Sequence, residues 1–134
     1  MDKETKEALP QQRIEKQLAE LYLFMKRTNE YSEWWRESTL QQWVQELQQE
    51  VAEMKVELEK NDQEKFRQEL GDVLWDVLAL ILKSEEKGIV NLEELLPEIQ
   101  KKFKRRKHFV VEGKKVSKAE EAKIWEEVKR REAA

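Results

Sequence analysis

The fold of this chain is decided by residues 39–82, TLQQWVQELQQEVAEMKVELEKNDQEKFRQELGDVLWDVLALIL. Apolar residues recur in this segment at steps of three and four, which is the period of an amphipathic helix. The pattern predicts a first helix that opens with the capping box Thr39-x-x-Gln42 and a second that Asn61-x-x-Glu64 caps. Residues 39–82 therefore predict two long, consecutive helices.

Acidic residues recur at helical spacing in both of these helices. The motifs are Glu50-x-x-Glu53 and Glu69-x-x-Asp72, with 15 residues between them. An i, i+3 pair places two carboxylates on one helix face. Two such helices packed antiparallel bring four carboxylates together, where they repel one another unless protons or cations intervene. Hard oxygen ligands of this kind suit Mg²⁺ or Mn²⁺, which are the cations that commonly bind polyphosphates in enzymes.

The second helix carries a further acid in an apolar stretch. From Val73 to Leu82 the helix is apolar almost all round, apart from Asp76. A helix of that kind needs burial on every side, which predicts a subunit interface. Gly71 is expected to permit a close helix approach beside the carboxylates. Buried acids need partners, and the alternative to a metal is a set of salt bridges to Lys55, Lys65 or the basic run at 101–108.

The rest of the chain predicts shorter elements around this pair. Residues 1–9 are polar and expected to be loose. Pro10 fits the first turn of a helix, and Ser117-x-x-Glu120 is a capping box for a last helix. The further expectations are a helix at 10–28, a loop at 28–39, a helix from Asn91 that Pro97 bends or restarts, and a loop or hairpin at 109–116. The fold class is all-α, a four- to five-helix bundle that dimerisation completes.

The basic run offers a way to bind phosphate. Lys102, Arg105 and Arg106 fall at i, i+3 and i+4 and share a helix face. Arg and Lys side chains can bind the negative charge that a polyphosphate keeps after a metal has bound. The alternative is that these basic residues form an ordinary solvent-exposed helix face. His108 is the single histidine, and a structural role is favoured over a catalytic base. Trp125 is either an anchor for the last helix or a surface for nucleobase stacking.

Composition narrows the class of protein. The chain has 134 residues, of which 41% are charged, and a net charge of −3, so it gives no nucleic-acid signal. It has no cysteine, which excludes thiolate metal sites and disulfides. No apolar run approaches the length of a membrane span, and no signal peptide is expected. We expect a single domain over residues 1–134, without a membrane partner, in the cytoplasm.

Several segments together resemble one family. The two acidic motifs, with Gln68-Glu69-Leu70-Gly71-Asp72-Val73-Leu74 as the context of the second, resemble the MazG nucleoside triphosphate pyrophosphohydrolases of the all-α NTP pyrophosphatase superfamily. The segments at 102–106 and 125–129 resemble the family's K-x-x-R-R and W-E-x-x-K. Trp34 resembles the tryptophan of an upstream C-P-W-D segment, although Trp35 stands in place of its Asp. The resemblance covers about residues 32–132, with the helix at 10–28 as an addition.

The resemblance implies an activity and a set of roles. The activity is hydrolysis of a nucleoside triphosphate to the monophosphate and pyrophosphate, in nucleotide-pool sanitation. Mg²⁺, or Mn²⁺, would be held by Glu50, Glu53, Glu69 and Asp72. Lys102, Arg105, Arg106 and Trp125 would bind the substrate, and the chain would form a homodimer or higher homo-oligomer. The alternatives are a pyrophosphohydrolase for a specialised nucleotide (dUTP, dCTP or phosphoribosyl-ATP) and a non-catalytic helical interaction protein.

Overall fold

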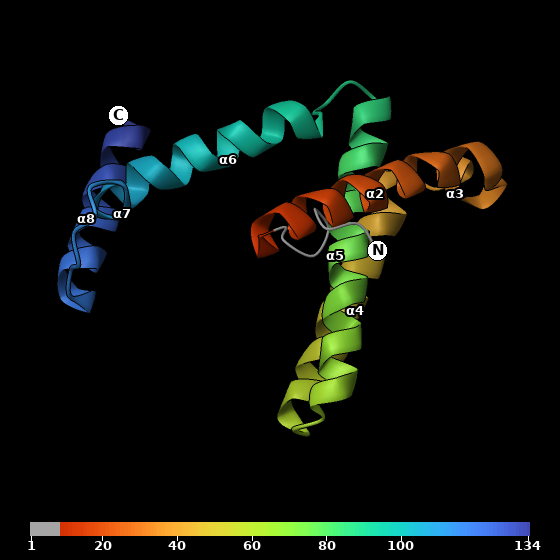
Figure 1. Cartoon of the computed structure of the whole chain (residues 1–134), viewed down its shortest axis with the longest axis horizontal. Coiled ribbons are helices and arrows are strands. Elements are labelled where there is room, and N and C mark those ends of the chain that lie inside the picture. The colour runs from red at the N-terminus through yellow and green to blue at the C-terminus, as the bar shows by residue number, and fades with distance from the viewer. Residues whose placement is uncertain (1–8) are drawn as a thin grey trace. The chain divides into compact units, whose positions relative to one another are not determined.

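The computed structural model describes residues 9–134, and the expectation for residues 1–8 lies outside that range. Over this range the chain forms seven helices and no strand, so the predicted all-α class is confirmed (Figure 1). The helices are α2 (Pro10–Tyr31), α3 (Glu33–Glu37), α4 (Leu40–Glu59), α5 (Gln63–Glu86), α6 (Leu92–Arg106), α7 (His108–Val111) and α8 (Lys118–Ala133). None of the described helices is long and apolar enough to cross a membrane.

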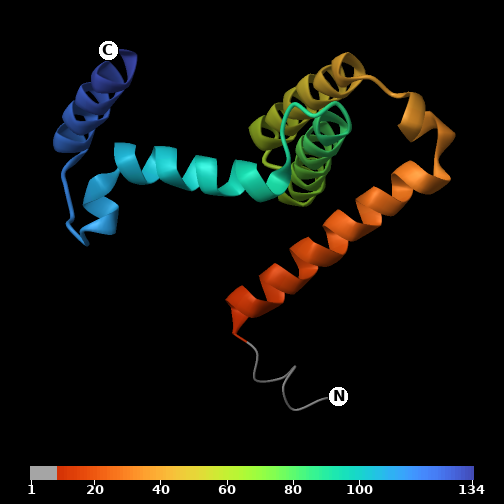
Figure 2. The same cartoon turned by 90° about the horizontal axis from the view of Figure 1, so that it is seen from above.

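Contacts within the chain group the residues into two compact units. The first is Met1–Ile89 and the second is Val90–Ala134. In the first unit, α4 and α5 lie side by side and antiparallel, and α2 contacts α3 and α5 (Figures 1 and 2). In the second unit, α6 contacts both α7 and α8.

Side-chain caps fix where most of these helices begin. Thr39 Oγ1 accepts from Gln42 N at 3.2 Å, while Gln42 Oε1 accepts from Thr39 N at 2.8 Å, which confirms the capping box. Ser117 and Asn91 cap α8 and α6 as predicted, since Ser117 Oγ accepts from Glu120 N at 3.2 Å and Asn91 Oδ1 accepts from Glu94 N at 2.8 Å. The predicted capping box at Ser117 is incomplete, because Glu120 Oε1 accepts from Ser117 Oγ and not from the Ser117 backbone N–H. The cap of α5 is not Asn61 but Asp62, whose Oδ1 accepts from Lys65 N at 3.1 Å. Asn61 instead adopts a left-handed φ of 58°, which lets a three-residue turn join α4 to α5.

One local prediction was wrong, and two others were wrong in part. The predicted loop at 28–39 is largely helical, because Ser32 ends one helix and starts another: its N–H donates to Thr28 O at 2.9 Å, and its Oγ accepts from Trp35 N at 3.1 Å. The helix from Asn91 does not restart at Pro97, which lies inside α6 (Leu92–Arg106). The segment at 109–116 is not a hairpin: residues 109–111 belong to α7, and residues 112–116 form the alternative loop, with Gly113 at a φ of 70°.

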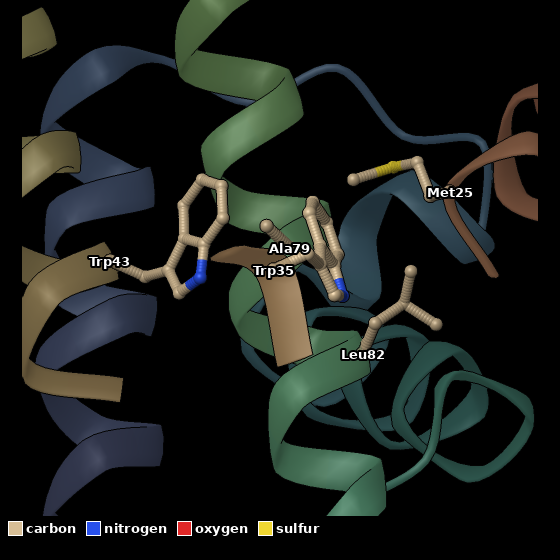
Figure 3. Packing of buried hydrophobic residues seen from close by; sticks show 5 residues of the cluster. All are labelled: Met25, Trp35, Trp43, Ala79 and Leu82. Carbon is tan, nitrogen blue, oxygen red and sulfur yellow. The ribbon is translucent and has the colours of Figure 1, made fainter. Parts of the chain in front are cut away.

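The core of the first unit is aromatic. Trp35 is 2% exposed and packs against Trp43 at 5.1 Å and Trp75 at 6.0 Å between ring centroids. Figure 3 shows Trp35 between Trp43 on one side and Met25 and Leu82 on the other. The five-residue helix α3 thus places Trp35, one of two adjacent tryptophans, at the centre of the core.

The exposed side of α5 remains apolar. Leu70, Leu74 and Val77 are 48%, 47% and 38% exposed. The expected close approach at Gly71 does not occur within the chain, because a Cβ built there would meet no atom within 4 Å. The predicted subunit interface therefore stays a prediction, and these side chains are the surface available to it.

Candidate metal centre

The antiparallel α4–α5 pair brings the two acidic motifs together. The three-residue turn between the helices sets their register, so that Glu50 on α4 lies opposite Glu69 and Asp72 on α5. One carboxylate oxygen each from Glu50, Glu69 and Asp72 lies within 4.8 Å of the other two. Oxygens at this spacing can share one divalent cation, whose own ligand distances are about 2.0–2.6 Å.

Two of these carboxylates each have one oxygen without a donor. Glu50 Oε2 and Glu69 Oε2 are buried and have no hydrogen-bond partner among the described residues. Buried polar atoms are ordinarily paired, so each orphaned oxygen calls for an explanation such as an ion. Glu53 adds its negative charge beside Glu50, and its Oε1 accepts from Gln49 Nε2 at 3.2 Å. The donor set therefore fits a hard cation.

Electrostatics in the cluster favour a proton or a cation. A hydrogen bond to the Glu69 carboxyl, followed by burial and by the charges of Glu53, Glu69 and Asp72, raises the pKa of Glu50 to about 8. Like charges this close ionise one after another rather than together. The salt bridges offered as an alternative are absent from residues 9–134, since no described ion pair includes these four acids or Asp76.

Asp76 and Glu46 extend the acidic face by one turn. Asp76 is 6% exposed, and its Oδ2 is buried without a hydrogen-bond partner. Burial, and then the charges of Glu46 and Asp72, raise the pKa of Asp76. At the other end of the face, Glu57 Oε2 is also buried and unpartnered.

The basic residues of the predicted clamp lie together in the second unit. Arg105 Nη2 lies 2.9 Å from Glu132 Oε1, and Arg106 Nη2 lies 2.9 Å from Glu132 Oε2. Hydrogen bonds, first from Arg106, lower the pKa of Glu132 to about 2. Two guanidinium groups on one carboxylate show that this pair can bind an oxyanion bidentately. Lys102 Nζ lies 5.9 Å from the centroid of the Phe103 ring.

The two other predicted positions have partners in the same unit. Trp125 is half-buried, with its ring centroid 6.2 Å from that of Phe103 and 5.0 Å from the Arg106 guanidinium carbon. These contacts fit the anchoring alternative for Trp125. His108 Nδ1 lies 3.3 Å from Glu112 Oε1. In the first unit, Trp34 is 62% exposed and meets only the edge of Trp43, at 5.6 Å between ring centroids.

Two important residues were not singled out from the sequence. Glu132 lies in a charged C-terminal stretch, where nothing in the pattern marks it as the partner of both arginines. Lys83 follows the apolar stretch of α5 and is 2% exposed, with its ammonium group directed at the end of α3. A lone lysine ending an apolar run was the one available signal for that burial.

Comparisons with known proteins agree with this arrangement. Residues 38–111, more than half of the chain, match the family described as MazG nucleotide pyrophosphohydrolase domain. The fold is similar to that of a MazG-related protein from Thermotoga maritima, with a TM-score of 0.79 at 24% identity, covering 84% of this chain and 98% of that one. Among curated proteins, none matches the chain. The matched region contains both acidic helices and the three converging carboxylates, and the chain belongs to the MazG nucleotide pyrophosphohydrolase domain family.

Proposed function

We propose that this protein hydrolyses nucleoside triphosphates, ribo- or deoxyribo-, to the monophosphate and pyrophosphate with Mg²⁺ as cofactor, cleaning the cytoplasmic nucleotide pool. The observation that carries the proposal is the convergence of Glu50, Glu69 and Asp72, which form no ion pair with a cationic side chain among residues 9–134. Membership of the MazG family supports a nucleotide pyrophosphohydrolase in general. The choice of Mg²⁺ as the cofactor and of nucleoside triphosphates as the substrates is part of the proposal.

Four carboxylates would hold the metal. Glu50, Glu69 and Asp72 supply the converging oxygens, and Glu53 stands beside Glu50 on the same face of α4. When bound, Mg²⁺ supplies charge neutralisation at the phosphates and a water of lowered pKa. Mn²⁺, which has similar ligand preferences, is expected to substitute.

The protein's own groups would position the substrate. A carboxylate of the cluster orients the attacking water toward the phosphorus that links the monophosphate to pyrophosphate. Lys102, Arg105 and Arg106 bind the triphosphate and stabilise the charge on the departing pyrophosphate. The carboxylate of Glu132 is held by the same two arginines and would have to yield to the phosphate. Trp125 lines the pocket for the base or sugar.

The proposed assembly is a homodimer or higher homo-oligomer of a single-domain chain. Its support is the exposed apolar row on α5, formed by Leu70, Leu74 and Val77. Burying such a row against a second copy removes apolar surface from water, at about 25 cal/mol per Å². Light scattering over a range of protein concentrations measures the mass, and a Leu74→Glu variant should shift it toward the monomer.

Pyrophosphate release from a panel of triphosphates, with Mg²⁺ and with EDTA, tests the activity. Metal-dependent release from several nucleotides supports the proposal, and the spread of rates reports the preference for base and sugar. Release from dUTP, dCTP or phosphoribosyl-ATP alone would indicate a specialised enzyme. No release from any nucleotide, by folded protein supplied with Mg²⁺ or Mn²⁺, would favour a helical interaction protein instead.

A further inference from the structure

Trp35 carries a hydrogen-bond donor that the fold leaves unpaired. The side chain is 2% exposed, and its Nε1 is buried with no acceptor among residues 9–134. The nearby Trp43 shows the usual outcome, since its Nε1 donates to Ser38 Oγ at 2.9 Å. A buried indole N–H normally finds an acceptor. The N–H of Trp35 therefore calls for an acceptor that the described part of the chain does not supply.

The unpaired N–H belongs to a residue that lines a hollow beside α2 and α5. Trp35 borders this hollow of about 310 Å³ together with Met25 of α2 and Leu82 of α5. Figure 3 shows the indole nitrogen of Trp35 on the side of Leu82 and away from Trp43. None of the residues that line the hollow belongs to the three converging carboxylates of the metal centre. The hollow is therefore a separate candidate site within the first unit.

A second hydrogen-bonding group without a partner lines the same hollow. Asn29 is half-buried on α2, and its backbone oxygen accepts from Arg36 Nη1 at 3.1 Å. Its side-chain amide, in contrast, forms no hydrogen bond with any other residue of the range 9–134. A side-chain amide offers an acceptor oxygen and two donor hydrogens close together. The hollow thus presents an indole donor and a free amide, and both groups are neutral.

The charged side chains at the rim of the hollow already have partners in the protein. Glu85 Oε2 accepts from the Tyr22 hydroxyl at 3.1 Å, and Glu86 Oε2 lies 3.1 Å from Lys83 Nζ. Lys26 Nζ lies 5.0 Å from the centroid of the Tyr22 ring. Two carboxylates and one ammonium group line the hollow, so its charge repels anions, including phosphate esters. The ligand that fits the two free groups is a neutral molecule.

We infer that this hollow binds a small neutral lactam, a cyclic amide that presents a carbonyl oxygen beside an N–H. The carbonyl oxygen accepts from Trp35 Nε1, and the adjacent N–H donates to the side-chain oxygen of Asn29. The ring packs against Met25 and Leu82, as ligands commonly do in apolar pockets with a few orienting polar groups. Free bases with a lactam edge, such as uracil, and simple lactams, such as δ-valerolactam, share this chemistry. The inference requires no metal and does not rest on the proposed function.

Heteronuclear NMR of the five tryptophan indole N–H groups of the whole chain, recorded in EDTA, tests the site. Uracil and δ-valerolactam are the probes, and binding should shift the signal of Trp35. The loss of that signal in Trp35→Phe assigns it, and the contacts of Trp35 with Trp43 and Trp75 assign it independently. Shifts from both probes would support a site for lactams in general, and shifts from uracil alone a site for bases.

A matched probe tests the pairing with the ligand's N–H. N,N′-dimethyluracil keeps both carbonyl groups of uracil but has no N–H, so it should bind about tenfold more weakly or worse. Equal affinity for the two molecules would overturn the inferred contact with Asn29 and, with it, the assignment of the ligand class.

A matched pair of variants tests the same contact from the protein's side. Asn29→Leu should weaken the binding of uracil by about tenfold or more, because the ring N–H loses its acceptor. Gln17→Leu is the control, since it makes the same change at an exposed position of α2 outside the hollow, and it should bind uracil like the wild type. Thermal unfolding shows that both variants fold. Wild-type affinity in a folded Asn29→Leu would overturn the site.

Two further outcomes of the titration would also overturn the site. A signal of Trp35 that neither probe shifts would leave its N–H to a buried water molecule. A shift confined to Trp125 would place uracil in the base pocket of the proposed function instead. Failure of nucleotide hydrolysis, in contrast, would leave a shift at Trp35 unexplained by the catalytic site and would keep the lactam site.

Discussion

Lys83 Nζ donates a hydrogen bond to the backbone oxygen of Trp35 at 2.8 Å, with a second to Arg36 O at 3.3 Å. These carbonyls belong to the last turn of α3, where Trp35 O also accepts from the Ser38 backbone N–H at 3.2 Å and from Ser38 Oγ. A lysine on α5 therefore holds in place the short helix that carries the central tryptophan of the core.

Lys83→Met should lower the free energy of unfolding by about 1–3 kcal/mol, because it removes the charge-assisted hydrogen bonds to Trp35 O and Arg36 O. Urea denaturation followed by tryptophan fluorescence measures the change. Lys87→Met, at an exposed position just beyond α5, is the control and should alter stability little. Equal midpoints for all three proteins would show that the hydrogen bond contributes nothing.

Glu53→Gln and Asp72→Asn should each lower metal-dependent pyrophosphate release more than about 100-fold, since each removes a proposed metal ligand. Circular dichroism should show helicity near that of the wild type, because both changes are isosteric. Glu57→Gln, on the same face of α4, should keep its activity. Undiminished hydrolysis in either variant would remove these residues from the metal centre.

Arg105→Ala should raise the KM for a nucleoside triphosphate by about tenfold, the effect of one lost charge-assisted hydrogen bond. Steady-state kinetics measures it, with Lys101→Ala as a control in the same basic segment. The clamp would be wrong if KM and kcat both matched the wild type. Glu132→Gln offers the reciprocal test, because weakening the contacts of both arginines should lower KM.

Without metal, the protein should lose stability as the pH rises from about 4.5 to about 8. The pKa of Glu50 is raised from 4.5 to about 8 on folding, so in this window the folded state binds more protons than the unfolded state. The stabilisation is complete below pH 4.5 and lost above pH 8, and Asp76 acts in the same direction. Glu132, whose pKa is lowered from 4.5 to about 2, acts in the opposite direction only at the acidic end of this window, because above about pH 5.5 it is ionised in both states.

Thermal melts in EDTA between pH 4.5 and 8.5 measure this dependence. Glu50→Gln should flatten the curve, and saturating Mg²⁺ should offset the loss at high pH. A flat profile for the metal-free wild type would contradict the coupling between Glu50 and Glu69.

The features that the sequence predicted well are local ones. Thr39 and Ser117 accept from the backbone N–H three residues on as expected, because an N-cap depends only on residues three apart. The convergence of Glu50 with Glu69 and Asp72 was predictable once two amphipathic helices with a short turn were assumed. The break at Ser32 was predicted as a long loop, because the sequence alone does not show that a single serine ends one helix and caps the next.

The features that the sequence did not predict depend on tertiary packing. Trp34 and Trp35 are adjacent and chemically identical, yet the first is 62% exposed and the second 2%. Trp35 is the one that packs against Trp43 and Trp75, and the Lys83 hydrogen bond to its backbone oxygen ties it to α5. Glu132 lies 26 residues from Arg106 along the chain, and only the packing of α8 on α6 joins them.

The three-residue turn between α4 and α5 has a consequence for how the metal centre forms during folding. Every carboxylate from Glu46 to Asp76 belongs to one helical hairpin, so the acids that meet in the centre are close to one another along the chain. The centre needs no closure of a long loop, and its assembly should coincide with the zipping of the hairpin. Because the same step crowds negative charges, divalent cations should accelerate folding of this hairpin as well as stabilise the folded protein.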